Sequence, residues 1–395
     1  MKRSERRLQL VYTMAQGTYW LLAVVIGAFL TPLLADRGFS EYEIGVISAV
    51  RSVATCVFQL VIAYLMDKYA KKVQVKYVIE VLACIGIIVS WYFYENTVSF
   101  SVAIIIFVLF GLGITSIAAL LDSLSALFLN AGRQLDYPPA RAFGSITWAI
   151  ACLALGRFCV AYGENKMLLL QILFGFVFLC NMFFLEKVPK KQETTETEQR
   201  NPHNILQLFF LSSGYTLMIL GVFAASMCYN MANCFMIDVI KNCGGTTMHY
   251  GIANFVLAIS EGGTVFVFAK FRKKWGLKIL LLLFAVFNAV KPLGMILFPS
   301  VIGIIALQVL QMLGYGIYYP ANVAFVMEEL PEEDVVKGVS VANVVNCIGA
   351  AAGFYVSGQI YAIWGITALL WSSAAMGGIS VCIMGINVLW KRKSR

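Results

Sequence analysis

The chain has 395 residues, of which 60% are hydrophobic and only 13% are charged, and its mean hydropathy is +0.80. Soluble domains carry about 25% charged residues, so this composition excludes an ordinary soluble protein and predicts a polytopic membrane protein. The formal net charge of +9 does not indicate a nucleic-acid partner, because the basic residues gather in short joints between apolar segments.

Twelve segments are long and apolar enough to cross a bilayer, whose hydrocarbon core takes about 20 residues of helix. The longer segments have room for a tilt or an interfacial turn. The predicted spans are 9–34, 43–66, 75–94, 99–128, 141–161, 167–186, 205–238, 246–270, 278–298, 300–327, 338–362 and 366–390. The sequence therefore predicts an all-α membrane protein with twelve transmembrane helices.

The basic residues fall mainly in alternate joints. They crowd the N-terminal MKRSERR, the joints around 68–76 and 270–278, the segment 187–200 and the C-terminal KRKSR, whereas the opposite joints hold Arg37, Lys166 and Lys241. By the positive-inside rule, both termini are predicted to be cytoplasmic. The charged start runs directly into a full-length span, so no cleavable signal peptide is expected.

One segment, from Glu186 to Asn204, is charged, Thr-rich and poor in apolar residues. It predicts an N-terminal six-helix bundle over 1–186, a cytoplasmic linker over 187–204 and a C-terminal six-helix bundle over 205–395. A basic corner follows the second span of each half, AYLMDKYAKK at 63–72 and AKFRKKWGLK at 269–278. Such a repeat is typical of transporters built from two related halves.

Charged residues inside the spans indicate possible binding groups. Asp122 closes the fourth span and Arg141 opens the fifth, where a charge costs about 2.5 to 3.5 kcal/mol unless it is paired or faces water. Trp148 lies two helical turns after Arg141 and is expected on the same helix face. Gly144, between them, is expected to let the fourth and fifth spans approach closely.

Structural alternatives exist for the same residues. Asp122 and Arg141 can form a purely structural ion pair, and Trp148 can be a packing or lipid-facing indole. Glu80, near the end of the third span, is expected to snorkel or to pair with Lys76 four residues earlier.

The first basic corner resembles the signature G-x-x-x-D-(R/K)-x-G-(R/K)-(R/K) of the major facilitator superfamily, with Ala63 and Ala70 at the two glycine positions. The resemblance implies the superfamily fold, in which two six-helix bundles rock against each other. It also implies a conformational gate motif, which comprises Asp67, Lys68, Lys71 and Lys72.

The stretch YPPARAFGSITW, from Tyr137 to Trp148, resembles the start of the fifth helix in the lactose permease and its oligosaccharide/proton symporter relatives. Asp122 stands where that family has a carboxylate, and further similarity covers GFSEYEIGVISAVRSVATCVFQLVIAYLMDK and SGQIYAIWG. The resemblance implies that Asp122, Arg141 and Trp148 bind substrate. A sugar offers rim hydroxyls to charged groups and an apolar face to an aromatic plate.

The second half departs from that family, because amides stand where the family has charges. These amides are Asn230, Asn233, Gln308, Gln311 and Asn346. Acids and their basic partners are lost together, as expected when loss of one member of a buried pair would leave an uncompensated charge. Tyr229 is kept, and Glu261 and Lys291 stand where the family has a Glu and an Arg. A single amide can alternatively form an interhelical hydrogen bond worth about 0.6 kcal/mol.

These comparisons give a second-half binding set of Tyr229, Asn230, Asn233, Glu261, Gln311 and Asn346. The candidates for proton coupling are Asp122, Glu261 and Lys291.

The predicted function is a secondary active transporter for a small hydrophilic solute, most readily a saccharide or glycoside, working by alternating access with proton symport. The alternatives are a nucleoside or aromatic-acid transporter of the same fold, a uniporter without proton coupling and, remotely, a non-transporting sensor. No phosphate-binding loop, nucleophile/base set or Cys/His metal spacing is present in the sequence, so neither an enzyme nor a cofactor is expected. The expected partners are the solute, a proton and the lipid bilayer. The expected state is a monomer, and the resemblance implies a bacterial cytoplasmic (inner) membrane.

Overall fold

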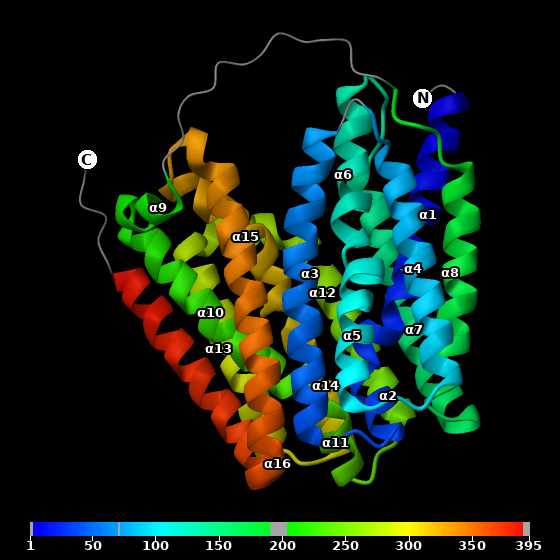
Figure 1. The fold of residues 1–395 in the computed structure, drawn as a ribbon. Coiled ribbons are helices and arrows are strands. Elements are labelled where there is room, and N and C mark those ends of the chain that lie inside the picture. The colour runs from blue at the N-terminus through cyan, green and yellow to red at the C-terminus, as the bar shows by residue number, and fades with distance from the viewer. Residues whose placement is uncertain (1–2, 70–71, 190–203, 390–395) are drawn as a thin grey trace. The chain divides into compact units, whose positions relative to one another are not determined.

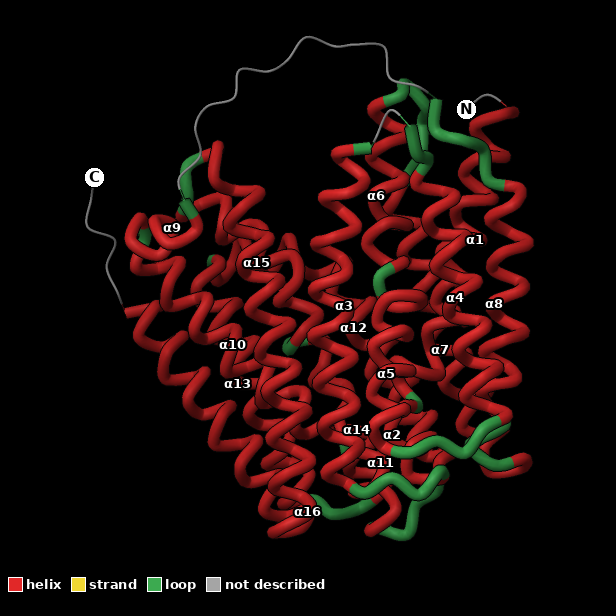
Figure 2. The backbone as a smooth tube through the Cα atoms, in the orientation of Figure 1, coloured by secondary structure: helices red, strands yellow, loops and turns green. Residues whose placement is uncertain are grey.

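The computed structural model describes residues 3–69, 72–189 and 204–389, and the chain divides into two compact units, Met1–Glu196 and Thr197–Arg395. Every regular element of the described residues is a helix (Figure 2), so the predicted all-α class is confirmed. Most of the predicted linker, 190–203, lies outside the described residues. The predicted bundle boundaries at 186 and 205 therefore stay predictions.

The described part of the first unit contains eight α-helices and one π-helical turn (Figure 1). Their bounds are α1 (Arg3–Ala28), α2 (Leu30–Asp36), α3 (Glu41–Lys68), α4 (Val75–Glu95), α5 (Phe100–Phe110), η1 (Gly111–Thr115), α6 (Ile117–Asn130), α7 (Tyr137–Tyr162) and α8 (Met167–Phe184). The helix α1 packs along α7 and α8, and α4 packs along α8.

The π-helical turn η1 interrupts the predicted span 99–128 just before the candidate residue Asp122. Its two glycines bring the turn close to its neighbours: a Cβ on Gly113 would lie 2.9 Å from the backbone nitrogen of Gly86 in α4, and one on Gly111 would meet Ala54 of α3 at 2.9 Å. The Ser116 hydroxyl donates to the Gly111 carbonyl at 2.7 Å, which satisfies part of the irregular backbone. π-Helical turns of this kind occur frequently at functional sites.

The described part of the second unit begins at residue 204. Its elements are α9 (Ile205–Leu211), α10 (Ser213–Cys234), α11 (Met236–Asn242), α12 (Thr247–Trp275), α13 (Leu277–Leu297), α14 (Val301–Leu307), η2 (Gln308–Met312), α15 (Tyr315–Glu329), η3 (Glu332–Asp334) and α16 (Val335–Leu389). Both α10 and α13 pack along α16, and α12 packs against the 3₁₀ turn η2. The core of this unit includes Tyr215, Phe284, Tyr318 and Phe325, each buried.

Three further predicted spans are broken where the prediction had one helix. The span 9–34 breaks at Phe29, because Pro32 has no N–H for the carbonyl of residue 28 and its ring crowds that carbonyl. The span 205–238 breaks at Ser212, whose hydroxyl accepts from the Tyr215 N–H and caps α10, and again at Phe235. The span 300–327 contains the 3₁₀ turn η2.

The spans 338–362 and 366–390 run together as α16. Gly365, with φ of 80°, is the non-helical residue inside this 55-residue element, and glycine takes such a φ without steric cost.

Ten helices among the described residues are long and apolar enough to cross a membrane, or eleven when Thr247–Thr264 and Val267–Trp275 count as one span. A multi-pass membrane protein is thus confirmed. The number of twelve and the cytoplasmic location of both termini stay predictions.

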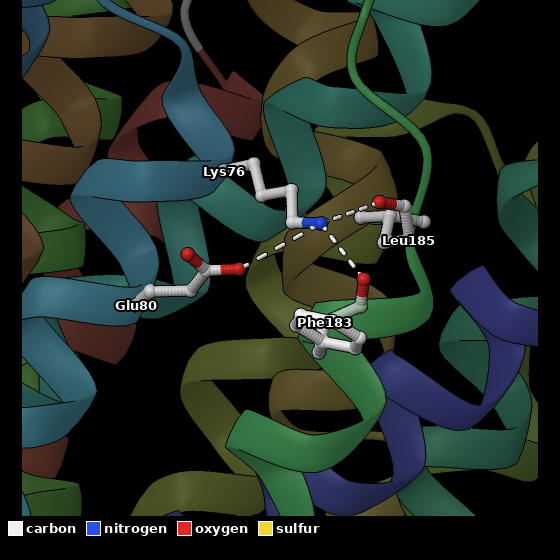
Figure 3. Close-up of polar contacts among 4 residues, drawn as sticks. All are labelled: Lys76, Glu80, Phe183 and Leu185. Carbon is white, nitrogen blue, oxygen red and sulfur yellow. Dashed lines mark hydrogen bonds and ion pairs between the residues drawn. The ribbon is translucent and has the colours of Figure 1, made fainter.

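Lys76, at the start of α4, caps the C-terminus of α8 (Figure 3). It is only 7% exposed, and its Nζ donates to the carbonyls of Phe183 at 3.0 Å and Leu185 at 2.6 Å. Glu80 lies 3.8 Å from the same Nζ, so the predicted i, i+4 pair is present. A cation at a helix C-terminus satisfies carbonyls that have no partner within the helix and interacts favourably with the helix dipole.

We predict that Lys76→Met destabilises the protein, because the buried Leu185 carbonyl, the partly buried Phe183 carbonyl and Glu80 lose their partner. Each buried polar group left unsatisfied costs about 1 to 3 kcal/mol. Thermal unfolding in detergent measures the effect, with Lys241→Met, which removes an exposed lysine of α11, as the matched control. Equal unfolding temperatures for the two variants would contradict the assigned role.

Candidate functional site

In the first unit, Asp122 is held by α1. The Gln16 side chain, 1% exposed, donates from Nε2 to Asp122 Oδ1 at 2.9 Å and to the Tyr12 hydroxyl at 3.1 Å. Tyr12 in turn donates to the Leu121 carbonyl at 3.0 Å. These bonds fix α6 against α1 at two consecutive residues. Tyr137 and Arg141 of α7 are further polar groups near the carboxyl of Asp122.

Arg141 and Trp148 of α7 both contact Trp20 of α1. The Arg141 guanidinium carbon lies 4.4 Å from the Trp20 ring centroid, and its Nη1 donates to Ser145 at 2.9 Å. The Trp148 ring meets Trp20 edge to face, with centroids 5.4 Å apart. Arg141 and Trp148 therefore share one helix face, as their spacing predicts, and Trp20 joins them as a second indole.

Gly144 does allow a close helix contact, but the predicted contact with the fourth span was wrong. A Cβ at Gly144 would lie 2.4 Å from Cδ1 of Trp20, so this glycine admits α1, the first predicted span, and not the fourth. The sequence spacing gives the face of α7 on which Gly144 lies but not which helix covers that face. The alternative of a direct Asp122/Arg141 ion pair is also absent among the described residues, since Arg141 bonds Ser145 and stacks on Trp20.

The second unit gathers a cluster around Lys291 of α13, which is 2% exposed. Its Nζ donates to Asn233 Oδ1 at 3.2 Å and, at 3.5 Å, to Gln311 Oε1, and lies 5.2 Å from the ring centroid of Tyr229. Gln311 donates to Glu261 Oε2 at 3.3 Å. Glu261 also interacts electrostatically with Lys291. Five predicted residues from α10, α12, α13 and η2 thus come together.

Asn346 and Asn230 differ in their relation to this cluster. Tyr315 packs on Tyr229 with ring centroids 4.5 Å apart and donates to Asn346 Oδ1 at 3.0 Å, so Asn346 is linked to the cluster. The Asn230 amide donates to the Ser226 carbonyl of its own helix at 2.8 Å. The structure therefore does not bring Asn230 to the Lys291 cluster.

The gate motif is only partly described. Lys68 and Lys72 are exposed, and Lys68 Nζ lies 5.6 Å from the ring centroid of Tyr69. The side chain of Asp67 and the whole of Lys71 lie outside the described residues. The gate role of these four residues stays a prediction.

Four residues of these clusters were not predicted from the sequence, namely Tyr12, Gln16, Trp20 and Tyr315. Gln16 and Trp20 stand four apart with Tyr12 on α1, a polar and aromatic stripe at helical spacing that could have been noticed. Tyr315 lies in the motif YGIYYP directly after η2. The irregular turn interrupts the helical periodicity there, so the sequence does not show which way this side chain points. Among the described residues, no group of three or more His, Cys, Asp or Glu side chains could hold a metal ion.

A multi-pass helical chain with charged and amide side chains buried inside each unit has the features of a membrane transporter. The chain belongs to the MFS_1 like family, whose model matches residues 12–371. Its predicted resemblance to the major facilitator superfamily is thereby confirmed. A search of curated protein sequences finds no match.

Solved structures of transporters share the fold. A crystal structure of a point variant of the nucleoside transporter NupG is similar, with a TM-score of 0.81 at 14% identity over 97% of this chain and 99% of that chain. Another NupG structure has a TM-score of 0.75 at 15% identity, over 97% and 100%. A bacterial homologue of the human lysosomal transporter Spinster, inward-facing and unoccupied, has a TM-score of 0.64 at 13% identity, over 98% and 96%. At these identities the likeness concerns the fold alone.

We predict that Gly144→Ala separates α1 from α7, because the new Cβ meets the Trp20 ring. Overpacking of this kind costs about 1 to 3 kcal/mol. The matched control is Gly385→Ala in α16, where a Cβ meets nothing within 4 Å and alanine is the better helix former. Thermal unfolding compares the two variants. If Gly144→Ala is as stable as Gly385→Ala, the tight α1/α7 contact is refuted.

A second prediction concerns the buried charges of the Lys291 cluster. Lys291→Gln leaves the Glu261 carboxylate without its cation and is expected to cost about 3 to 5 kcal/mol of stability. The double variant Glu261→Gln/Lys291→Gln removes both charges and should recover much of the loss. Thermal unfolding of the single and double variants measures this coupling, and a double variant no more stable than Lys291→Gln would show that the two groups are independent.

Proposed function

We propose that this protein is a secondary transporter that moves a small sugar-bearing solute, a saccharide or glycoside, by alternating access with proton symport. The observation that carries the proposal is the cluster of Asp122, Arg141, Trp20 and Trp148 in the first unit. A carboxylate and a guanidinium hydrogen-bond vicinal hydroxyls, and indole faces pack on the C–H face of a sugar ring. The proposed binding residues of this unit are Asp122, Arg141 and Trp148.

The proposed binding set of the second unit is Tyr229, Asn230, Asn233, Glu261, Gln311 and Asn346. Of these residues, Asn230 lies outside the cluster around Lys291. Amides both donate and accept hydrogen bonds, and tyrosine rings stack on flat groups. This combination also suits the heterocyclic base of a nucleoside, which is itself a glycoside. Together with the fold shared with NupG, it makes a nucleoside the second candidate solute.

The proposed topology has twelve spans with both termini cytoplasmic. The 55-residue α16 is about 80 Å long at 1.5 Å per residue, more than twice the hydrocarbon thickness. Division at Gly365 turns it into two spans, which raises the count from eleven to twelve. The proposed membrane is the bacterial cytoplasmic membrane, and the proposed state is a monomer.

We infer that Asp122 carries the proton in symport. Glu261 and Lys291 are the other candidates, but they interact with each other inside the second unit. Protonation of Glu261 would leave the Lys291 ammonium without its buried counter-charge, which is costly. Asp122 accepts a hydrogen bond from the neutral Gln16 and also interacts electrostatically with Arg141. Arg141 keeps the Ser145 hydroxyl and the Trp20 ring as partners when Asp122 is protonated. Protonation of Asp122 therefore leaves no buried cation without a partner.

For solute binding, we predict that saccharides or nucleosides raise the unfolding temperature of the purified protein and that Asp122→Asn weakens this effect. A ligand at 100 times its dissociation constant adds about 2.7 kcal/mol of apparent stability. Loss of a hydrogen bond to a charged group costs about 1.5 to 3 kcal/mol, roughly a ten- to hundredfold rise in dissociation constant. The panel contains disaccharides, monosaccharides, nucleosides and aromatic acids.

The matched control for this screen is Asp136→Asn, which removes an exposed carboxylate just before α7. It should bind like the wild type. A shift confined to nucleosides would select the second candidate, and a saccharide shift unaltered in Asp122→Asn would remove Asp122 from the site.

For coupling, we predict that a downhill flow of solute into lightly buffered vesicles alkalinises the outer medium, because protons enter with it. Asp122→Asn should abolish this pH change, whereas Asp136→Asn should keep it. A glass electrode or a pH-sensitive dye follows the reaction. Solute entry by the wild-type protein without any pH change would establish a uniporter.

A further inference from the structure

The hydrogen-bond chain from Leu121 through Tyr12 and Gln16 to Asp122 has a single possible direction. The Leu121 carbonyl can only accept, so at 3.0 Å the Tyr12 hydroxyl must use its one hydrogen there. The Tyr12 oxygen is then an acceptor for the group on its other side, which is the Gln16 side chain at 3.1 Å.

This direction fixes the orientation of the Gln16 amide. Its Nε2 carries two hydrogens, one for Tyr12 and one for Asp122 Oδ1 at 2.9 Å. A turned amide would place the Gln16 oxygen against the Tyr12 oxygen, two acceptors in contact at a site where Gln16 is only 1% exposed. An amide orientation is assigned from its network, and here a backbone carbonyl one residue before Asp122 decides it.

We propose that Gln16 is a positioning residue of the transport site, which holds Oδ1 of Asp122 as a hydrogen-bond acceptor in both protonation states so that Oδ2 takes the proton. The inference rests on the proposed function, in which Asp122 carries the proton. The step is a proton transfer from a hydronium ion to Oδ2, in which one O–H bond of hydronium breaks, an O–H bond forms at Oδ2 and water is left; the return step reverses it. In the protonated acid, Oδ1 is the carbonyl oxygen and keeps its bond from Gln16, while the Oδ2 hydroxyl is a new donor.

Other titratable or charged groups surround the same carboxyl. They are Tyr12 and Tyr19 on α1, and Tyr137 and Arg141 on α7. Among these groups, Tyr12 donates its hydrogen to the Leu121 carbonyl, and Tyr137 has its own polar interaction with the Asp122 carboxyl. The amide of Gln16 is neutral, so it can stay hydrogen-bonded while Asp122 gains or loses its proton. An ammonium or guanidinium group in the same position would oppose protonation of Asp122.

The test uses the full-length protein in lipid vesicles and needs no solute. Infrared difference spectra between high and low pH show the carbonyl stretch of each carboxyl that becomes protonated, and the band lost in Asp122→Asn belongs to Asp122. A carbonyl oxygen that accepts a hydrogen bond absorbs at lower frequency. Gln16→Met removes the donor at similar length, so the Asp122 band should move to higher frequency.

The matched control is Gln171→Met. Gln171 is a second buried glutamine of the same unit, whose Nε2 donates to Ser90 at 2.7 Å while Ser90 donates to the Gly86 carbonyl at 2.6 Å. It repeats the amide–hydroxyl–carbonyl chain without a carboxyl at its end. Gln171→Met should therefore leave the Asp122 band unmoved, even if it lowers stability as much as Gln16→Met.

Tyr12→Phe gives a second variant should Gln16→Met not fold. It removes the hydroxyl that fixes the amide, so both amide orientations become possible and the Asp122 band should broaden. An Asp122 band that stays at its wild-type position and width in both variants would overturn the role of Gln16 alone. If Asp122→Asn removes no band at any pH, Asp122 is not the proton carrier, and the proposed coupling fails together with this inference.

Discussion

A polar group inside a membrane-length helix must find its partner within the protein, because the bilayer core offers none. Each unit satisfies this requirement differently. In the first unit a carboxylate is compensated by neutral donors, with Gln16 bonded to Asp122, while Arg141 lies on the π face of Trp20. In the second unit the Lys291 ammonium is compensated by two amide oxygens and by Glu261. Under the proposed function, the first arrangement lets a carboxyl change charge, whereas the second keeps opposite charges together.

Both clusters lie beside interruptions of regular helix. The π-helical η1 ends seven residues before Asp122, and Gln311 lies inside the 3₁₀ turn η2. Irregular backbone is tolerated at membrane depth only where it is buried in protein or lines a water-filled cavity, and in each unit a neighbouring helix packs against the turn. Gly113 of η1 fits against Gly86 of α4, and Thr264 donates to the Met312 carbonyl at 2.7 Å beside Gly316. The close packing of small residues therefore accommodates the irregular turns η1 and η2, beside or within which Asp122 and Gln311 lie.

The all-helical class and the multi-pass character could be predicted from the sequence, because the length of the apolar runs follows from the thickness of the bilayer. The shared face of Arg141 and Trp148 also followed from helical spacing. Interhelical partners could not be predicted in the same way. Gly144 was assigned to the wrong neighbour because one helix does not encode which other helix covers it.

Other differences have local causes. Pro32 signals the helix break at Phe29, but the span 9–34 was predicted from its continuous apolar character, which takes no account of proline. Asn230 reads as a cavity amide in the sequence, yet its side chain bonds back to Ser226 in the same helix, a choice that spacing alone does not reveal. Gln16 shares a face of α1 with Tyr12 and Trp20, which the spacing shows, but the spacing does not reveal that its partner is Asp122, which is distant in sequence.

Counterflow in reconstituted vesicles shows whether the chain carries a sugar-bearing solute across a membrane. Vesicles loaded with an unlabelled saccharide or nucleoside are diluted into a trace of the same compound in labelled form, so that exchange needs neither an ion gradient nor knowledge of the coupling ion. We expect the label to accumulate transiently inside vesicles that contain the protein. Entry of every labelled saccharide and nucleoside at the rate of protein-free vesicles would contradict it.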